Sequence, residues 1–450
     1  MSTSITVAGL ENRPAWWHNQ TIRVTASVAR GWDLHHTLLS RTQWDRELLD
    51  DHVRGRLREL CARAATHGPF RQRAAATSAA ETLDLTHFPV LDKKDLVENW
   101  DALHTGLVDP VDVLRVFTSG TTGQPISIDH SDRQLDYGSA CSLRVLDAYG
   151  LAPGLRCLRV TCDPRHPLLD FDVVDALGPA LQLNVSKVTP ENRATVHDIC
   201  AQFRPDAIWG QPMELLITTS KIRDGLVPAL TPKLVMTHGD NVSPRTRSVI
   251  RETFEAAHCD YYALQELGQV AWQCPVEVDT YHVNEERVLL RFLPDNILAL
   301  TSLINTAMTL VNYAPQDCAV PVPEPCSCGR VLARVRQIKG RQRGFLVDSD
   351  GGHLNIKWLQ TTLDGLPVAA WRVAQREAGT LHIDLAYDAH SSAAAEIDRL
   401  RAGIADRLRM SQVTIGVSTP EAVIGDSGKV RQFDLYATQE TVADNLLGAS

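Results

Sequence analysis

The chain has 450 residues, and its 45 lysines and arginines against 54 aspartates and glutamates give a formal net charge of −9. Its hydrophobic fraction of 44% and charged fraction of 22% are ordinary for a folded protein, which excludes intrinsic disorder, collagen and coiled coil. The length predicts about two or three domains around a large buried core. The acidic balance provides no basic surface for nucleic acid or for an anionic membrane.

The N-terminus and the cysteines bear on the cellular compartment. Residues 1–7 contain no basic segment followed by an apolar one, and charged residues interrupt every apolar run before a membrane-spanning length. We therefore expect a cytoplasmic protein. Ten cysteines are too few for a disulfide scaffold of this size, and in the cytoplasm they would stay reduced and available to a metal.

The apolar periodicity predicts alternating helices and strands. Residues 43–70 have the pattern of an amphipathic surface helix, and residues 113–117 that of a strand which ends in small polar residues. Further along, short strands are expected at 155–161, 207–209, 234–236 and 288–292, and helices at 191–203 and 244–257. This alternation predicts an α/β fold with a largely parallel sheet.

The pattern changes where Gly340 and Gly344 bracket a basic stretch. Hairpins are expected after this point, followed by one amphipathic helix with Ile397, Leu400, Ile404 and Leu408 on one face. We therefore predict a large N-terminal α/β domain over residues 1–340, a hinge over 341–345, and a small mobile C-terminal α+β domain over 346–450.

The strongest motif follows the strand at 113–117 and reads Thr118-Ser119-Gly120-Thr121-Thr122-Gly123-Gln124-Pro125. Its glycines let backbone N–H groups converge, and its hydroxyls add neutral donors, which suits phosphate oxygens. It is not a Walker loop, because the Gly-Lys-Ser/Thr ending is absent. Composition alone is equally compatible with an ordinary solvated loop. The order of the residues resembles the phosphate-binding loop of the adenylate-forming superfamily, which includes acyl-CoA ligases, peptide-synthetase adenylation domains and luciferases.

Two later segments resemble other nucleotide-binding motifs of that superfamily. Residues 261–266 are similar to its Tyr-Gly-x-Thr-Glu segment, which implies that Glu266 holds magnesium and that Tyr262 lies against adenine. A carboxylate is the ligand that a hard divalent cation bridging phosphates prefers. Residues 312–317 resemble the Tyr-Arg-Thr-Gly-Asp motif, whose aspartate, here Asp317, receives both ribose hydroxyls.

The remaining matches concern the purine, the hinge and the C-terminal domain. Residues 237–240 resemble the segment whose backbone borders the purine, which assigns Gly239 and Asp240 to nucleotide binding. Arg341 matches the ribose-contacting arginine at the hinge, and Lys429 matches the mobile lysine that stabilises the charge developing at the α-phosphate. The resemblance therefore implies three catalytic residues, Thr118, Glu266 and Lys429, and phosphate contacts from Ser119, Gly120, Thr121, Thr122 and Gly123.

Within the superfamily the chain is most similar to phenylacetate-CoA ligase and its relatives, on softer features at Trp44, 87–96, 209–212 and 326–330. Cys326-x-Cys328, together with Cys274 and His282 upstream, would supply the Cys3His ligand set of a structural zinc. Some ligases of this branch carry such a metal site. The alternative is a set of ordinary buried thiols and a solvent-facing histidine.

The chain also departs from the family pattern. Ile126 replaces the common Lys or Thr, Gln265 the usual Thr before the magnesium ligand, and residues 314–316 the usual Arg-Thr-Gly. At the hinge, Gln342 or Arg343 stands where Asp or Lys is usual. The first changes are expected to weaken or alter nucleotide binding. The change at the hinge affects the domain rotation that thioester formation requires.

The resemblance implies an ATP- and Mg²⁺-dependent ligase that adenylates a small, aromatic carboxylate and transfers it to CoA. One alternative is a biosynthetic enzyme with an amine or carrier-protein acceptor, or one that activates an unusual oxyanion such as nitrite. Another is a non-catalytic homologue that only binds nucleotide. Retention of Lys429, Glu266, Asp317 and Arg341 together argues against the last. No nucleic-acid or membrane partner is expected.

Overall fold

The computed structural model describes most of the chain between residues 26 and 435. The described residues are 26–66, 85–109, 113–117, 127–163, 165–170, 177–242, 244–339, 346–350, 353–354, 357–364, 366, 368, 370–386, 394–418, 423 and 433–435. No helix within these ranges is both long and apolar enough to cross a membrane.

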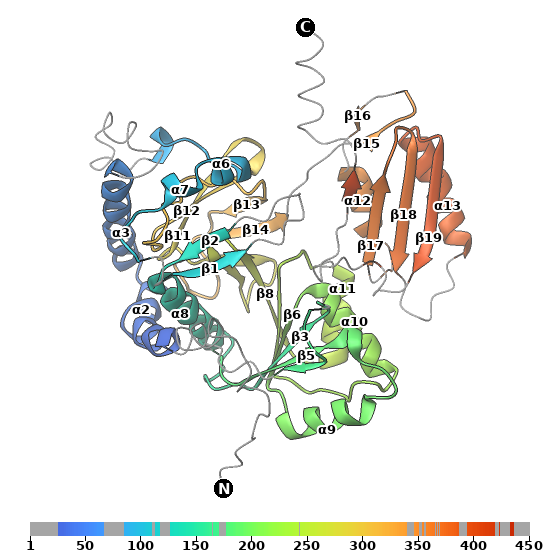
Figure 1. The fold of residues 1–450 in the computed structure, drawn as a ribbon, viewed down its shortest axis with the longest axis horizontal. Coiled ribbons are helices and arrows are strands. Elements are labelled where there is room, and N and C mark those ends of the chain that lie inside the picture. The colour runs from blue at the N-terminus through green and yellow to red at the C-terminus, as the bar shows by residue number, and fades with distance from the viewer. Residues whose placement is uncertain are drawn as a thin grey trace.

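A ten-stranded sheet forms the centre of the molecule, in the order β13-β14-β10-β9-β8-β7-β6-β3-β5-β4 (Figure 1). Its middle, β5-β3-β6-β7-β8, is parallel, and the strands on either side are antiparallel. The strands are β3 Cys157–Thr161, β4 Leu169–Asp170, β5 Ala180–Asn184, β6 Ala207–Gly210, β7 Leu234–His238, β8 Ala257–Leu264, β9 Gly268–Gln273, β10 Thr280–Val283, β13 Cys318–Val322 and β14 Arg334–Lys339.

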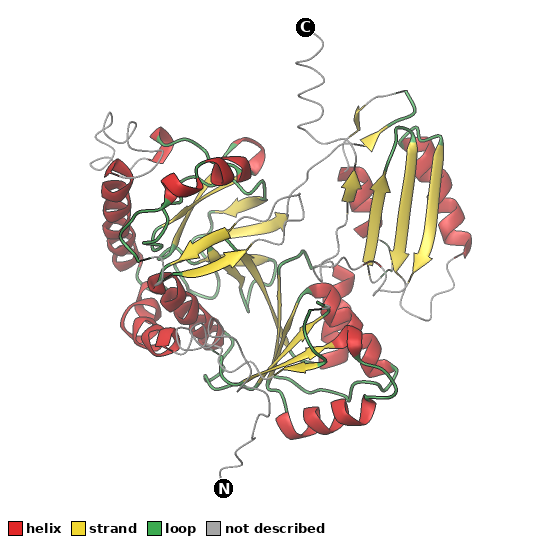
Figure 2. Cartoon of the chain, in the orientation of Figure 1, coloured by secondary structure: helices red, strands yellow, loops and turns green. Residues whose placement is uncertain are grey.

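Three helices connect the parallel strands, as parallel neighbours require. They are α9 Arg193–Phe203, α10 Pro212–Arg223 and α11 Pro244–Phe254. One face of the sheet, with Leu158 and Val235, packs in a common core with Leu215 of α10 and Ile250 of α11. Figure 2 shows these helices gathered beside the parallel strands. The expected strands at 207–209 and 234–236 and helices at 191–203 and 244–257 are therefore confirmed within a few residues.

The N-terminal helices and two small hairpins pack against the other end of the sheet. The helices include η2 His35–Leu39, α2 Ser40–Thr42, α3 Arg46–Thr66, α6 Lys93–Glu98, α7 Trp100–Leu103 and α8 Asp132–Ala148. The hairpins are β1 Leu114–Phe117 with β2 Ser127–His130, and β11 Val288–Phe292 with β12 Leu298–Ser302. The strand expected at 288–292 exists, but it belongs to its own antiparallel hairpin and not to the large sheet, because its partner follows after a short turn.

A second, smaller sheet with its own core lies at the C-terminal end. Its order is β19-β18-β17-β20. The elements are β15 Leu346–Val347, β16 His353–Leu354, α12 Lys357–Asp364, β17 Ala370–Gln375, β18 Thr380–Ala386, α13 Ala394–Arg407, β19 Gln412–Ser418 and β20 Phe433–Leu435. The α/β class with a smaller C-terminal α+β unit is confirmed. The hinge expected at 341–345 lies outside the described residues, so its boundaries stay a prediction.

The C-terminal sheet contacts the main body through small side chains. Ala370, Ala386 and Val423 are buried in the same apolar cluster as the residues of α10 and α11. The strands that carry the two alanines, β17 and β18, otherwise build the separate C-terminal core. The described contact between the two cores is therefore made by short apolar side chains.

A buried ion pair joins three distant segments near α8. Arg144 and Glu286 are 0% and 1% exposed, and Thr42 donates a third hydrogen bond to the Glu286 carboxylate. Burial would raise the pKa of Glu286, but the charge and hydrogen bonds of Arg144 lower it instead. Arg144 also donates to Asn284 Oδ1 and to the Leu39 carbonyl, so the pair is well supplied with partners.

We expect Glu286→Gln to destabilise the fold strongly, because it leaves the Arg144 charge buried without a counter-ion. The free energy of unfolding in urea should fall by about 3–5 kcal/mol. Asp398→Asn, in the exposed Arg401–Asp398 pair, is the control and should cost less than about 1 kcal/mol. Equal losses in the two variants would show that the buried pair has no special role.

Candidate functional site

The predicted phosphate loop connects the two strands of a hairpin. β1 and β2 pair antiparallel, with Phe117 opposite Ser127. The loop residues between them, 118–126, lie outside the described residues, so Thr118, Ser119, Gly120, Thr121, Thr122 and Gly123 stay predicted contacts. The strand expected before the loop is confirmed as β1.

Side chains of four residues fix this hairpin to the protein body. Arg115 Nε and Nη2 donate to the two carboxylate oxygens of buried Asp129, at 2.7 and 2.8 Å. His104 Nε2 lies 3.0 Å from Asp129 Oδ2, and Trp100 Nε1 donates to the Ser127 carbonyl at 2.7 Å. Burial would raise the pKa of Asp129, but its hydrogen bonds with Arg115 and His104 lower it. The two ends of the phosphate loop therefore start from anchored strands.

The predicted magnesium and ribose ligands form a pair of tyrosine–carboxylate hydrogen bonds. Glu266, in the turn between β8 and β9, accepts at 2.8 Å from the hydroxyl of Tyr313. Asp317 accepts at 2.8 Å from the hydroxyl of Tyr262. Both carboxylates are buried, and burial together with Asp317 raises the pKa of Tyr262. The structure thus brings Tyr262, Glu266 and Asp317 together, and their roles at adenine, magnesium and ribose stay predictions.

Tyr313 is a candidate site residue that the sequence reasoning missed. It lies within the segment 312–317 and is fully buried, and its hydroxyl reaches Glu266 across 47 residues of sequence. It stands where the family motif begins with tyrosine, and this position is the only signal that could have singled it out. Its partner could not have been identified without the fold.

The predicted purine segment follows β7, next to the strand that carries Tyr262. Gly239 has φ +80°, a left-handed conformation that glycine adopts without strain. β7 and β8 are parallel neighbours, with His238 opposite Tyr261. Because the carboxyl ends of parallel strands meet at one edge, Gly239 and Asp240 lie at the edge where ligands bind in α/β sheets.

A buried polar network supports this edge from inside the sheet. Asp260 accepts hydrogen bonds from Thr237 Oγ1 and, at 2.7 Å, from the hydroxyl of Tyr281. Its backbone N–H donates to Gln273 Oε1 at 3.0 Å. Burial raises the pKa of Asp260 to about 6, although the hydrogen bonds from Thr237 and Tyr281 act in the opposite direction.

We expect Asp260→Asn to change how stability depends on pH. The folded-state pKa of about 6 exceeds the ordinary value of 3.8, so the stability that this proton contributes is complete below about pH 4 and is lost as the pH rises through about 6. The free energy of unfolding in urea is measured for both proteins. The value for the variant minus the value for the parent should increase by about 3 kcal/mol between about pH 4 and pH 7. A constant difference across that range would contradict the raised pKa.

Two predicted residues cannot be placed. Arg341 and Lys429 both lie outside the described residues, so their roles at the ribose and at the α-phosphate stay predictions. The described strands nearest to them in sequence are β14, which ends at Lys339, and β20, which begins at Phe433.

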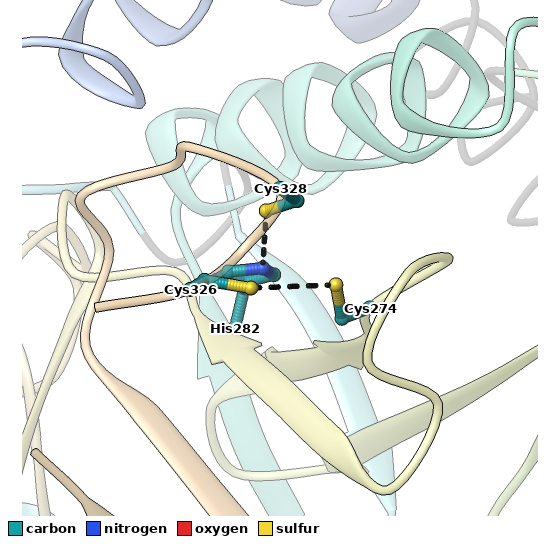
Figure 3. Close-up of side chains that lie close together, drawn as sticks. All are labelled: Cys274, His282, Cys326 and Cys328. Carbon is teal, nitrogen blue, oxygen red and sulfur yellow. Dashed lines mark hydrogen bonds between the residues drawn. The ribbon is translucent and has the colours of Figure 1, made fainter. Parts of the chain in front are cut away.

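The predicted zinc ligands come together at the antiparallel side of the sheet (Figure 3). Cys274 follows β9, His282 lies in β10, and Cys326 and Cys328 lie in the loop between β13 and β14. Their four ligand atoms all lie within 4.8 Å of one another. The Cys274 and Cys326 sulfurs are 3.7 Å apart, and Cys328 Sγ is 3.3 Å from His282 Nε2.

These distances fit a tetrahedral zinc ion. Zinc–sulfur bonds of about 2.3 Å at a tetrahedral angle place two sulfurs about 3.8 Å apart. Backbone N–H groups of Val276 and Glu277 also donate to Cys274 Sγ, at 3.4 and 3.3 Å, and so hold this sulfur in place. His282 is 0% exposed, so the alternative of a solvent-facing histidine is wrong. Burial, with Arg330 and Arg334 nearby, lowers the pKa of His282 to about 3, and the neutral imidazole is the form that binds metals.

The loop that carries the two cysteines is also fixed to the N-terminal helices. The guanidinium of Arg330 stacks over Trp44 and Trp272, at 4.7 and 5.5 Å from the ring centres. Its Nε donates to Gln43 Oε1 at 3.0 Å, and the Val331 N–H donates to the Gln43 carbonyl at 2.9 Å. A metal at this point would therefore join three parts of the fold.

We expect the purified protein to contain about one zinc per chain, measured by elemental analysis. Cys326→Ser should lose the metal and unfold at a clearly lower temperature, because the free energy of metal binding is also free energy of folding. Cys200→Ser, at a buried thiol in another core, serves as the control and should keep the metal. A metal-free protein, with Cys326→Ser as stable as the parent, would exclude the zinc site.

Comparisons with known proteins bear on the family resemblance and on the fold. No protein-family model matches the chain. The chain is 24% identical over 358 residues to the phenylacetate-coenzyme A ligase of Thermus thermophilus, covering 72% of this chain and 78% of that protein. Among solved structures, 2-hydroxyisobutyryl-CoA ligase in the postadenylation state with 2-HIB-AMP matches with a TM-score of 0.64 at 17% identity, over 88% of this chain and 92% of that one.

The chain is thus similar in sequence and in fold to adenylate-forming ligases. The resemblance to the phenylacetate-CoA ligase branch that was expected from the sequence is confirmed by the match to that ligase. A second structure of 2-hydroxyisobutyryl-CoA ligase, in the thioesterification state with 2-HIB-AMP and CoA, matches with a TM-score of 0.55 at 18% identity, over 91% of this chain and 94% of that one. The prediction of an adenylate-forming ligase therefore agrees with the sequence match and with the fold.

Proposed function

We propose that this member of the superfamily is an ATP-dependent ligase that converts a small carboxylic acid to its acyl adenylate and transfers the acyl group to CoA. The observation that carries the proposal is the pair of buried carboxylates, Glu266 and Asp317, each held by a tyrosine hydroxyl. The names of the sequence relative and of the structural neighbours, CoA ligases of small acids, support the same class of substrate.

The residues present suit a magnesium ion at Glu266. This carboxylate is only 3% exposed, and among the described residues no lysine or arginine forms an ion pair with it. A buried carboxylate without a cationic side chain is costly unless a cation binds it. Magnesium held by Glu266 would supply positive charge that stabilises the negative charge of the triphosphate.

In this proposal the chain's own groups orient ATP. The Asp317 carboxylate accepts hydrogen bonds from the ribose hydroxyls. Tyr262 lies against adenine, and the backbone at Gly239 and Asp240 borders the purine. Arg341 contacts the ribose, and the N–H and hydroxyl groups of residues 118–123 hold the phosphates. These contacts fix the α-phosphorus relative to the acid, which turns a bimolecular step into a nearly unimolecular one.

Adenylation and acyl transfer then follow as two displacements. A carboxylate oxygen attacks the α-phosphorus, and the bond to pyrophosphate breaks. Lys429 stabilises the negative charge that develops on the phosphoryl oxygens. The acceptor nucleophile next attacks the acyl carbon, and AMP leaves with the bonding electrons. We propose an aromatic acid as the substrate, zinc as a structural metal, and the cytoplasm as the location.

The principal alternative concerns the acceptor and the acid. The hinge residues Gln342 and Arg343 replace the usual Asp or Lys, and Ile126 replaces the usual polar residue after the phosphate loop. A biosynthetic enzyme that hands its adenylate to an amine or to a carrier-protein thiol, or that activates nitrite, would have the same first half-reaction. The two hypotheses therefore differ only in the second step or in the identity of the oxyanion.

We expect Lys429→Ala to reduce acid-dependent ATP–pyrophosphate exchange by about 100-fold or more, because one preorganised charge is lost from the transition state. Its circular dichroism spectrum and unfolding temperature should match the parent. Lys94→Ala removes an exposed lysine from a surface ion pair with Glu98 and should retain full exchange. Parental exchange activity in Lys429→Ala would overturn the assignment of this lysine.

The acceptor is tested by measuring AMP release from ATP over a panel of aryl and alkyl acids, with nitrite included. With the best acid, CoA should increase the rate and give the thioester. Gly344→Pro should slow this second step and leave exchange largely intact, because proline restricts the hinge. If CoA changes neither rate nor product, and an amine or a carrier protein does, the biosynthetic alternative replaces the CoA ligase.

A further inference from the structure

Three buried side chains converge on the turn that carries Glu266. His130 Nε2 lies 2.8 Å from the carbonyl oxygen of Gln265 and, since that oxygen can only accept, it donates. Gln134 Nε2 and Arg287 Nη2 donate to the carbonyl oxygen of Leu267, at 2.8 and 2.7 Å. The three side chains are between 2% and 5% exposed. The carbonyls on both sides of Glu266 are therefore fixed by donors from other elements.

The Arg287 contact is made at an energetic cost. Its side chain is buried, and its Nε and Nη1 atoms have no hydrogen-bond partner in the described part of the chain. No described aspartate or glutamate forms an ion pair with it, although the neighbouring Glu286 is paired with Arg144. A buried unpaired charge destabilises a protein, so packing alone does not account for an arginine at this position.

The backbone is adapted to this contact. A Cβ atom at Gly268 would lie 2.5 Å from Arg287 Nη2, and Gly268 has φ +70°. Both features require glycine immediately after Leu267, at the point where Arg287 reaches the turn. The Arg287 guanidinium can therefore reach the Leu267 carbonyl only because residue 268 is glycine.

His130 also connects this turn to the phosphate hairpin. It is the last residue of β2, and Ser127, the first residue of β2, follows the predicted phosphate loop directly. Asp129, the residue before it, binds Arg115 and His104 on the opposite side of the strand. One short strand therefore contacts the hairpin anchor through one residue and the Glu266 turn through the next.

We propose that His130, Gln134 and Arg287 are positioning residues that fix the turn at 265–267 and so aim the Glu266 carboxylate at a divalent cation bound to the phosphates. The inference rests on the proposed function. Outer contacts of this kind commonly change metal affinity or activity by about 10–100-fold when they are removed. Tyr313 orients the Glu266 carboxylate itself, whereas these three residues orient the backbone from which it extends.

The test compares His130→Leu, which removes the donor, with His130→Gln, which keeps an N–H group at similar reach. Two quantities are measured as a function of free Mg²⁺: acid-dependent pyrophosphate exchange, and the rise in unfolding temperature at saturating ATP without acid. His130→Leu should need about 10-fold more Mg²⁺ for half-maximal effect in both, and His130→Gln should restore most of the difference. Gln134→Met should shift both in the same direction but less, because Arg287 still holds the Leu267 carbonyl.

His35→Leu is the matched control. His35 is similarly buried, and its side chain forms a hydrogen bond with Asp147, at 2.8 Å, and not with the turn. The His35→Leu variant should have a lower unfolding temperature and an unchanged Mg²⁺ requirement. If His130→Leu and Gln134→Met also lower only the unfolding temperature, the three residues are structural and the inference is wrong.

Two further measurements keep the inference separate from the proposed function. If His130→Leu does not fold, Gln134→Met alone decides: an unchanged Mg²⁺ requirement overturns the inference. Glu266→Gln in the same assays tests the magnesium assignment. If Glu266→Gln raises the Mg²⁺ requirement and the positioning variants do not, only the inference fails. If Glu266→Gln has no effect on the Mg²⁺ requirement, the proposed magnesium site is wrong, and the inference that depends on it is wrong too.

Discussion

The site depends on one turn, the reversal of the chain between β8 and β9. In the middle of the sheet, β5-β3-β6-β7-β8, the strands run parallel and deliver their carboxyl ends to one edge, and β9 then pairs antiparallel with β8. The reversal leaves Glu266 inside the protein at this edge, with Tyr262 four residues before it on β8. The carbonyl groups on both sides of buried Glu266 need hydrogen-bond donors, and side chains from α8, β2 and the segment before β11 supply them. The backbone from which the Glu266 side chain extends is therefore held by these hydrogen bonds.

Much of the parallel sheet could be predicted from the sequence, because buried strands such as β6 and β7 are short apolar runs bounded by helices. The helix α10 was missed. Its apolar residues do not form a clear stripe, since Leu215, Leu216 and Ile217 are consecutive and all buried. Its start was nonetheless marked by Pro212 and by a capping box between Gln211 and Glu214. A periodicity argument fails for a helix that is buried on several sides.

Some residues of the site could likewise be predicted from the sequence, and others could not. Cys274, His282, Cys326 and Cys328 could be grouped from the sequence, because metal ligands are few and chemically distinctive. Asp317 and Glu266 could be found only by their resemblance to family motifs, since a single carboxylate carries no signal of its own. Tyr313 had only its position in the motif as a signal, and His130 and Arg287 could not be found at all. Their roles arise from contacts between residues 20 to 135 positions apart, which only the folded chain brings together.

The contact between the C-terminal sheet and the main body has a consequence for movement. Its buried described residues are two alanines and a valine, whose side chains hold few methyl groups and no hydrogen-bonding atoms. At about 0.8 kcal/mol for each buried CH₂ group, these three side chains contribute only a few kcal/mol to the contact. Apolar burial is non-directional, so these side chains do not by themselves fix the angle between the C-terminal sheet and the main body.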